Sequence, residues 1–319
     1  MTEQLAIGVD IGGTKIGFAL IDKQGQSLAT YRLPTNPSEG SNAVLDRVAQ
    51  GVHFLLKDAA GLVTGIGIGC PGQVNAATGI VHQAGNLGWF EVPLRAGVRQ
   101  RLNIDLPIWL DIDANANALG EMYFGAAREY QDFICITIGT GLGGSAVAGG
   151  QLVIGANSYA MEIGHIGLDP NGRHCVACGM RGCPEMYVSG NGLLAGVREH
   201  LPDYPQSSLA QIGEPTTAQI LAAARAKDGL ALTVMAEAAE WLYKVLACCT
   251  SMFNPALLVI GGGLGHAASD FFVEGLKEQI FKRTVPMSHQ GLEILQSQVN
   301  NSAVGAACLV WHRFRDGPH

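Results

Sequence analysis

Short apolar runs that end in glycine clusters alternate along this chain with longer amphipathic stretches. The short runs predict strands, and the stretches with apolar residues three and four positions apart predict helices. The predicted strands cover residues 5–10, 15–21, 27–33, 65–69, 108–112, 133–138, 145–150 and 256–260. The predicted helices cover residues 42–57, 114–125, 217–226, 230–252, 269–283 and 303–314. This mixture is typical of an α/β protein.

The opening pattern of strand, glycine loop and strand occurs twice, over residues 5–21 and again over residues 133–150. Such a repeat predicts a duplicated architecture of two lobes around a cleft. No linker rich in proline or serine separates the halves, so we expect interwoven lobes, with the last helix returning to the first. We predict a smaller N-terminal lobe of residues 1–117 plus 303–319 and a larger C-terminal lobe of residues 118–302.

Composition and charge narrow the classes of partner. Hydrophobic residues make up 48% of the 319 positions, the formal net charge is −7, and glycine is unusually frequent, with 43 residues. The negative charge argues against nucleic acid or an anionic membrane surface as a partner. The N-terminus does not resemble a signal peptide, and no apolar run approaches the roughly 18 residues of a membrane span. We therefore expect a cytoplasmic protein whose eight cysteines form no disulfide framework.

The first glycine loop brings together residue types that suit phosphates. Asp10 ends a strand, Gly12 and Gly13 expose backbone amides, and Thr14 and Lys15 add a hydroxyl and an amine. A carboxylate can orient Mg²⁺-bound water, while amides cradle phosphate oxygens. A simple tight turn is the alternative, and the string is not a Walker A motif.

Two further loops have related chemistry. The second, GTGLGG, contains Thr140 and Gly141, and a β-like segment rather than a helix follows it, which argues against a dinucleotide-binding fold. Two such hairpin loops across a cleft can clamp a triphosphate. The third loop contains Gly262 and Gly263 between a strand and a helix, where it can lie against an adenosine.

Asp113 stands between the strand IWLDI and the helix that follows. Ligands of α/β proteins gather at the carboxyl ends of strands, so this side chain is a candidate catalytic group. Asp is also a frequent helix N-cap, and spacing alone does not decide between the two roles. Glu162 and Glu185 carry the same ambiguity, because exposed surface charge is the ordinary role of a glutamate.

Soft metal ligands gather in one segment. Cys175, Cys178 and Cys183 follow the spacing C-x₂-C-x₄-C, and His165 precedes them. Three thiolates and an imidazole form a closed tetrahedral set for Zn²⁺, which predicts a structural rather than a catalytic metal.

Taken together, the chain resembles the ROK family of repressors, open reading frames and kinases. The strings that carry the resemblance span almost the whole chain: VDIGGTK (9–15), GIGCPGQV (67–74), GNLGW (85–89), DANANALGE (113–121), ITIGTGLGG (136–144), EIGH (162–165), CGMRGCPE (178–185) and NPALLVIGGG (254–263). The resemblance implies an actin-like ATPase (ribonuclease H-like) fold. It also implies ATP-dependent phosphorylation of a hexose at its primary 6-hydroxyl, with Mg²⁺ bound to the nucleotide.

The resemblance assigns roles to individual positions. Asp113 matches the catalytic base, and Zn²⁺ would be held by His165 and the three cysteines. The positions that match sugar-binding residues are Gly72, Asn86, Glu162, His165 and Glu185. The positions that match ATP-binding loops are Asp10, Gly12, Gly13, Thr14, Lys15, Thr140, Gly141, Gly262 and Gly263.

One position departs from the family in a way that bears on specificity. Family members usually carry Asn directly before the catalytic Asp, where its amide binds a sugar hydroxyl, and this chain has Ile112. We expect Ile112 to face the sugar and to alter the substrate preference. Two smaller departures are the extra residue between Cys175 and Cys178 and the bulky Met161 before Glu162.

Glucose is the first expected substrate, and mannose, fructose, allose and the N-acetylhexosamines GlcNAc and ManNAc are alternatives. A catalytically weak, sugar-sensing regulatory protein is a second hypothesis. The kinase branch is favoured because the first glycine loop begins by residue 9, with no segment before it for a winged-helix DNA-binding domain. A homodimer is the form that the resemblance implies.

Overall fold

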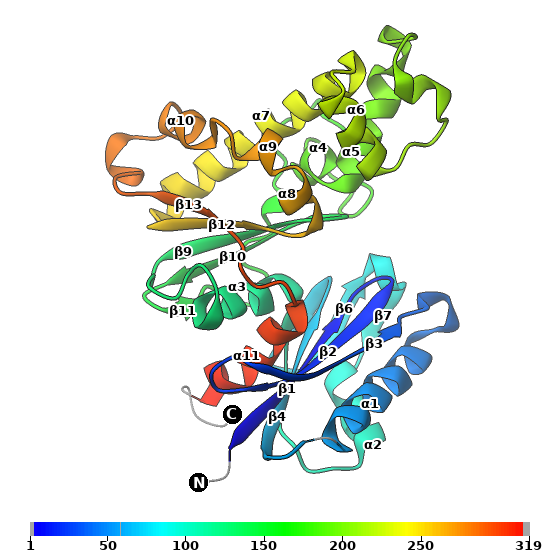
Figure 1. Cartoon of the computed structure of the whole chain (residues 1–319), viewed down its shortest axis with the longest axis vertical. Helices are drawn as coiled ribbons and strands as arrows, with labels where there is room; N and C mark the ends of the chain where they lie inside the picture. The colour runs from blue at the N-terminus through cyan, green and yellow to red at the C-terminus, as the bar shows by residue number, and fades with distance from the viewer. Residues whose placement is uncertain (1–2, 58, 315–319) are drawn as a thin grey trace. The chain divides into compact units, whose positions relative to one another are not determined.

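The computed structural model describes residues 3–57 and 59–314 (Figure 1). The chain divides into two compact units. The first contains the residues up to Gln131, Leu152–Ala160 and those from Ser297 onward, and the second contains Asp132–Gln151 and Met161–Gln296.

The unit boundaries differ from the predicted ones. The predicted boundary at residue 117 falls inside helix α3 (Asp113–Phe124), which packs against the last helix, α11 (Ser302–Phe314). Both helices belong to the first unit, so the chain leaves that unit only after α3 has ended. The prediction that the last helix returns to the first unit is confirmed.

A five-stranded sheet in the order β3-β2-β1-β4-β8 forms the centre of the first unit. β1 pairs with β2 antiparallel and with β4 parallel, and β8 continues the parallel side. The strands are β1 (Gln4–Ile11), β2 (Lys15–Asp22), β3 (Ser27–Pro34), β4 (Leu62–Cys70) and β8 (Ile108–Ile112).

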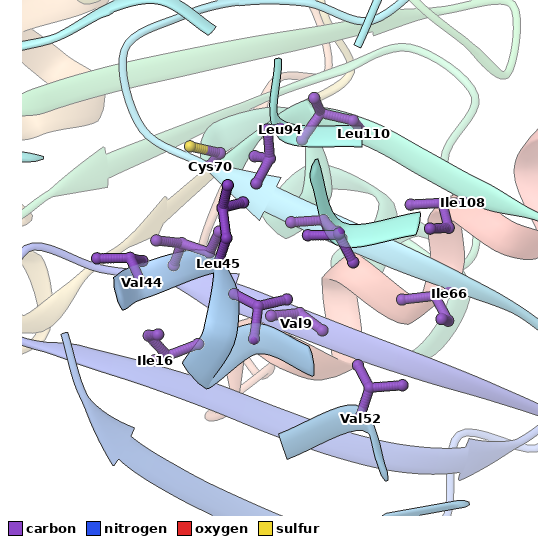
Figure 2. Packing of buried hydrophobic residues seen from close by; sticks show 14 of the residues in the cluster. Val9, Ile16, Val44, Leu45, Val52, Ile66, Cys70, Leu94, Ile108 and Leu110 are labelled. Atoms are coloured by element: carbon purple, nitrogen blue, oxygen red, sulfur yellow. The ribbon is translucent and has the colours of Figure 1, made fainter. Parts of the chain in front are cut away.

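Large apolar side chains occupy one face of this sheet. Leu5, Ile7 and Val9 alternate along β1 and enter a core cluster with residues of α1 (Ser41–Lys57) and α2 (Leu94–Leu102). Figure 2 shows this packing around Val9, with Val44, Leu45 and Val52 of α1 against the strands. The alternation follows from the period of two in a strand, which sends successive side chains to opposite faces.

The opposite face carries small residues because α11 lies directly against it. A Cβ atom at Gly8 would lie 1.7 Å from the carbonyl oxygen of Ala303, and one at Gly67 would lie 1.8 Å from that of Ala306. Only glycine permits such a close approach between backbones.

The chain segment between β4 and β8 forms a small sheet that was not among the predicted elements. Its order is β5-β6-β7, with antiparallel pairs. The segment contains β5 (Gln73–Asn75), β6 (Ile80–Ala84), the 3₁₀ turn η2 (Gly85–Leu87), β7 (Trp89–Val92) and α2. The strands are too short to give a clear pattern of alternation.

The second unit repeats the topology of the first. Its sheet has the order β11-β10-β9-β12-β13, in which β9 pairs with β10 antiparallel and with β12 parallel. The predicted duplication is therefore confirmed. The strands are β9 (Phe133–Ile138), β10 (Leu142–Ala148), β11 (Gln151–Leu152), β12 (Leu257–Gly261) and β13 (Glu293–Gln296).

Helix α7 (Gly229–Phe253) is the longest helix of the second unit, and α4, α5, α6, α9 and α10 contact it. The helix predicted over residues 269–283 is instead two short helices, because Gly275 between them adopts a φ of +72°.

Within the described part of the chain, no helix is both long enough and apolar enough to span a bilayer. The remaining helices are α4 (Glu185–Val188), α5 (Gly190–His200), α6 (Thr217–Arg225), α8 (Gly263–Ala267), α9 (Ser269–Phe272) and α10 (Leu276–Phe281). Further 3₁₀ turns are η1 (Pro37–Glu39), η3 (Ile163–His165), η4 (Leu201–Asp203), η5 (Ser208–Gln211) and η6 (Pro286–Ser288).

Candidate active site

The first glycine loop is the turn between β1 and β2 and is held by its own backbone. The amide of Gly12 donates to the carbonyl of Lys15 at 2.9 Å. Thr35, which follows β3, donates its hydroxyl to the carbonyl of Gly12 at 2.6 Å and its amide to that of Thr14 at 3.0 Å. Thr14 and Lys15 are exposed, so the turn holds the hydroxyl of Thr14 and the amine of Lys15 toward solvent on a fixed backbone.

Two predicted sugar-side positions lie in the same unit. A Cβ atom at Gly13 would lie 3.6 Å from Cβ and Nδ2 of Asn86, so the exposed turn η2 packs beside the glycine loop. Gly72 has a φ of +91°, and a Cβ atom there would lie 2.2 Å from the carbonyl oxygen of Gln83. The glycine at 72 is thus required by the close approach of β6 to the turn after β4.

Asp113 is the first residue of α3 and is partly buried at the end of β8. The N-cap position is Ile112, and no side chain caps this helix, so the alternative role of Asp113 as an N-cap is wrong. One carboxylate oxygen of Asp113 accepts a hydrogen bond from the amide of Ala114 at 2.8 Å. Burial raises the pKa of Asp113, although this amide partly opposes the effect. A carboxylate with a raised pKa accepts a proton more readily.

Asp10, near the end of β1, is a second carboxylate of this region. It is aligned with Gly69 of β4, and a Cβ atom at Gly69 would lie 3.5 Å from the Cα atom of Asp113. Burial raises the pKa of Asp10 to about 7, the nearby charge of Asp113 adds to this, and Lys15 opposes it. The repulsion between the two carboxylates favours the protonation of one of them or the binding of a divalent cation beside them.

Ile112 lies at the end of β8, next to Cys70 of β4 in the parallel register. Both side chains belong to the core cluster of the first unit, and Ile112 is 7% exposed. Burial raises the pKa of the Cys70 thiol, and the charges of Asp113 and Asp10 add to this, so the thiol is neutral. The position before Asp113 therefore offers an apolar surface where the family usually has an amide.

A buried polar pair behind Asp113 was missed at the level of sequence. Asp111 is fully buried, and one of its carboxylate oxygens accepts from the amide of Ile112 at 2.8 Å and from Nδ2 of Asn115 at 2.9 Å. The pair joins the end of β8 to the first turn of α3 and so fixes the backbone that carries Asp113. The signal was the spacing D-x-D-x-N, which places a strand residue opposite a helix residue four positions later.

In the second unit, the loop between β9 and β10 is shorter than predicted, because β10 already begins at Leu142. The loop is the turn Gly139–Thr140–Gly141. It is held by the amide of Gly190, which donates to the carbonyl of Gly139 at 2.8 Å, and by Glu185, whose Oε2 accepts from the amide of Leu142 at 2.9 Å.

Two of the three predicted sugar-binding residues of this unit, His165 and Glu185, lie close together. His165 ends η3, and its Nε2 lies 3.9 Å from Oε1 of Glu185. Glu162 directly precedes η3 and is exposed. Gly262 has a φ of +84°, and a Cβ atom there would lie 2.3 Å from the carbonyl oxygen of Ile138, so the third glycine loop packs on the end of β9, with Gly263 opening α8.

The four predicted metal ligands converge. The ligand atoms of His165, Cys175, Cys178 and Cys183 all lie within 4.8 Å of one another. The Sγ atoms of Cys178 and Cys183 are 3.5 Å apart, and Sγ of Cys175 is 3.6 Å from Nδ1 of His165.

These separations fit a tetrahedral zinc ion. Bonds of about 2.3 Å to sulfur and about 2.0 Å to nitrogen place two sulfurs about 3.8 Å apart and a sulfur and a nitrogen about 3.5 Å apart. The extra residue between Cys175 and Cys178 is taken up in a turn, in which Gly179, with a φ of +77°, donates its amide to the carbonyl of Cys175 at 2.8 Å. Burial raises the pKa values of the Cys175 and Cys183 thiols, so a cation is needed to hold them as thiolates.

Comparison with known proteins decides the family. The profile of the ROK family matches residues 6–313. The chain belongs to the ROK family. A glucokinase of Halalkalibacterium halodurans is 33% identical over 97% of this chain and 96% of its own length. The ROK glucokinase of Streptomyces griseus, solved with glucose and AMPPNP, is 33% identical, with a TM-score of 0.80 over 96% of this chain and 98% of that one.

A regulatory ROK protein is also similar. The xylose repressor of Caldicellulosiruptor bescii is 30% identical over 95% of this chain, which spans 76% of the repressor. ROK sugar kinases have the actin-like ATPase fold, so the predicted family and fold class are both confirmed.

Proposed function

We propose that this ROK protein is an ATP-dependent hexose kinase that phosphorylates the primary 6-hydroxyl of its sugar, with Asp113 as the general base. The observation that carries the proposal is the partly buried carboxylate of Asp113 at the junction of β8 and α3, beside the second carboxylate of Asp10. The glucokinase relatives, similar over nearly the whole chain, support the same reaction.

In this mechanism, Asp113 accepts the proton of the sugar hydroxyl as its oxygen attacks the γ-phosphorus. The bond between that phosphorus and the bridging oxygen breaks, and ADP leaves with the electron pair. The raised pKa of Asp113 strengthens it as a base, while its hydrogen bond to the amide of Ala114 fixes its direction. Mg²⁺, when bound with the nucleotide near Asp10, supplies positive charge for the phosphate oxygens.

We assign the sugar and the nucleotide to the residues that match the family motifs. The sugar contacts are Gly72, Asn86, Ile112, Glu162, His165 and Glu185. The nucleotide contacts are Asp10, Gly12, Gly13, Thr14 and Lys15 in the first glycine loop, and Thr140, Gly141, Gly262 and Gly263 in the second unit. The fixed backbone of the first loop and the strict need for glycine at 262 support this assignment.

Glucose is the proposed substrate because the relatives named glucokinases match over the full chain. Mannose, fructose, allose and N-acetylhexosamines are the alternatives, and the apolar side chain of Ile112 gives a reason to test each. We also propose a structural Zn²⁺ held by His165, Cys175, Cys178 and Cys183. Nδ1 of His165 faces Sγ of Cys175 and is the nitrogen that would bind the zinc. Nε2 of His165 faces Glu185, where it can contact a sugar hydroxyl.

We further propose that the protein works as a homodimer in the cytoplasm. The eight free cysteines suit a reducing compartment, which keeps the thiols of the proposed zinc site from pairing as disulfides. Light scattering on the purified protein tests the dimer.

A sugar-responsive regulatory role is the second candidate, favoured by the similarity to a xylose repressor. An assay that couples ADP release to NADH oxidation, run with a panel of hexoses and MgATP, separates the two. The kinase proposal expects sugar-dependent ADP release for at least one hexose. A sugar that stabilises the protein against heat but never stimulates ADP release supports the regulatory role instead.

A further inference from the structure

Glu185 lies between two features of the second unit that the sequence places far apart. It begins α4, two positions after Cys183 of the metal cluster, and its side chain is 16% exposed. Each of its two carboxylate oxygens has a different neighbour. A rotation of the carboxylate toward one neighbour therefore moves it away from the other.

The first neighbour is the glycine loop between β9 and β10. Oε2 of Glu185 accepts the amide of Leu142 at 2.9 Å, at the point where the loop enters β10. A Cβ atom at Gly141 would lie 2.5 Å from the same oxygen, which is too close for any real contact. The absence of a side chain at Gly141 is thus what lets the carboxylate reach the loop.

The second neighbour is the histidine beside the metal cluster. Oε1 of Glu185 lies 3.9 Å from Nε2 of His165, whose Nδ1 faces Sγ of Cys175 at 3.6 Å. The segment that carries His165 also packs on the loop, since a Cβ atom at Gly164 would lie 2.3 Å from the carbonyl oxygen of Leu142. A continuous path of contacts therefore runs from the cysteine cluster through His165 and Glu185 to Leu142.

We propose that Glu185, besides its own assigned contact with the sugar, couples the sugar-binding side chain of His165 to the second glycine loop. The inference rests on the proposed function, because it takes the loop as a nucleotide site and His165 as a sugar site. A nucleotide that orders the loop fixes Oε2 of Glu185, and Oε1 then holds the imidazole in the orientation that binds sugar. By linkage, bound sugar must tighten nucleotide binding by the same factor.

Two glycine variants of the same loop test the coupling. Neither Gly141 nor Gly139 has a φ in the left-handed region, so alanine suits the backbone at both. Gly141→Ala pushes the carboxylate of Glu185 away from Leu142, whereas Gly139→Ala enters open space, with nothing within 4 Å of the new Cβ. Calorimetry of the zinc-loaded protein, first without nucleotide, gives the dissociation constant of the sugar that the panel identifies.

The proposal expects Gly141→Ala to weaken sugar binding about three- to tenfold, the effect of losing one hydrogen bond. Gly139→Ala should stay within about twofold of the unchanged protein. A second pair of variants, at Glu185 itself, tests the effect of this carboxylate on the nucleotide loop. Glu185→Ala should weaken AMPPNP binding measured without sugar and speed hydrogen exchange at the amide of Leu142. Glu185→Gln, which still accepts a hydrogen bond, should restore part of both.

The coupling itself is read from the sugar dissociation constant with and without AMPPNP. The unchanged protein should bind sugar more tightly with the nucleotide present, and Gly141→Ala should lose that gain. If Gly141→Ala weakens only the nucleotide and binds sugar like Gly139→Ala, while the unchanged protein phosphorylates the sugar, the coupling is refuted and the kinase proposal stands. An unchanged protein that binds no hexose refutes both.

Discussion

Replacing Asp10 with asparagine should stabilise the protein without its ligands while weakening its hold on the nucleotide. The pKa of Asp10 is raised from 3.8 to about 7, chiefly by burial and then by the charge of Asp113. A raised pKa in the folded state means that the fold favours the protonated carboxyl. The resulting contribution to the free energy of unfolding is complete below about pH 4 and is lost as the pH rises through about 7.

The size of this loss follows from the same shift. One pKa unit corresponds to about 1.4 kcal/mol, so a carboxyl moved from 3.8 to about 7 is destabilised in its charged form by about 4 kcal/mol. Relaxation of a partly exposed group lowers this, and we expect about 2–4 kcal/mol above pH 8. Asp10→Asn carries no charge at any pH and therefore escapes the loss.

Urea unfolding at pH 5 and pH 8, without Mg²⁺ or nucleotide, measures the effect. The variant should gain about 1–3 kcal/mol over the unchanged protein between the two pH values, because only about two thirds of the shift from 3.8 to about 7 lies above pH 5. Asp105→Asn, an exposed aspartate of the same unit, is the matched control and should gain nothing. If the difference between Asp10→Asn and the unchanged protein is the same at both pH values, the raised pKa and the reasoning from it are wrong. The same variant should bind Mg·AMPPNP at least about tenfold more weakly, because a carboxylate ligand of the cation is gone.

Three further changes test separate parts of the structure. Gly67→Ala should cost about 3 kcal/mol or more in urea unfolding, since its Cβ would lie 1.8 Å from the carbonyl oxygen of Ala306, whereas Gly85→Ala, with nothing within 4 Å, should cost less than about 1 kcal/mol. Cys178→Ser should lower bound zinc from one ion per chain toward zero by metal analysis and destabilise the second unit; zinc-free unchanged protein would contradict the site. Ile112→Asn should raise kcat/KM several-fold for one hexose, because the new amide can bind a sugar hydroxyl at the proposed contact. A loss of about 1–3 kcal/mol in stability with no gain for any hexose would show instead that residue 112 lies wholly in the core.

Sequence periodicity located most of the regular elements of the sheet cores. Strand β8 was predicted with its observed bounds, and β1 differs by one residue at each end, because the apolar run and the carboxylate that follows mark the strand. The break between α9 and α10 was missed, since a lone glycine inside a helical pattern does not reveal its φ. The boundary between the units was missed because it depends on the packing of α3 against α11, which no local pattern encodes.

The features of the candidate site were likewise predictable from the sequence only in part. The ligand set of His165 and three cysteines was predictable because soft ligands at short spacing have few other uses where no disulfide framework is expected. The bond from Glu185 to the amide of Leu142 was not, because its partner is a backbone group 43 positions away. The buried pair of Asp111 and Asn115 was likewise hidden, since polar residues beside a strand end read as surface loop.

The central claim, that Asp113 is the general base of a hexose kinase, is tested most directly by the turnover of Asp113→Asn. Steady-state ADP release should show kcat lowered by about 10²- to 10⁴-fold, the range expected for the loss of a general base. Calorimetry on the same preparation should find the sugar dissociation constant within about threefold of the unchanged protein, because asparagine keeps the shape and one acceptor oxygen. A variant that binds the sugar and still turns over at close to the unchanged rate would contradict the account, because the proton would then be taken by another group.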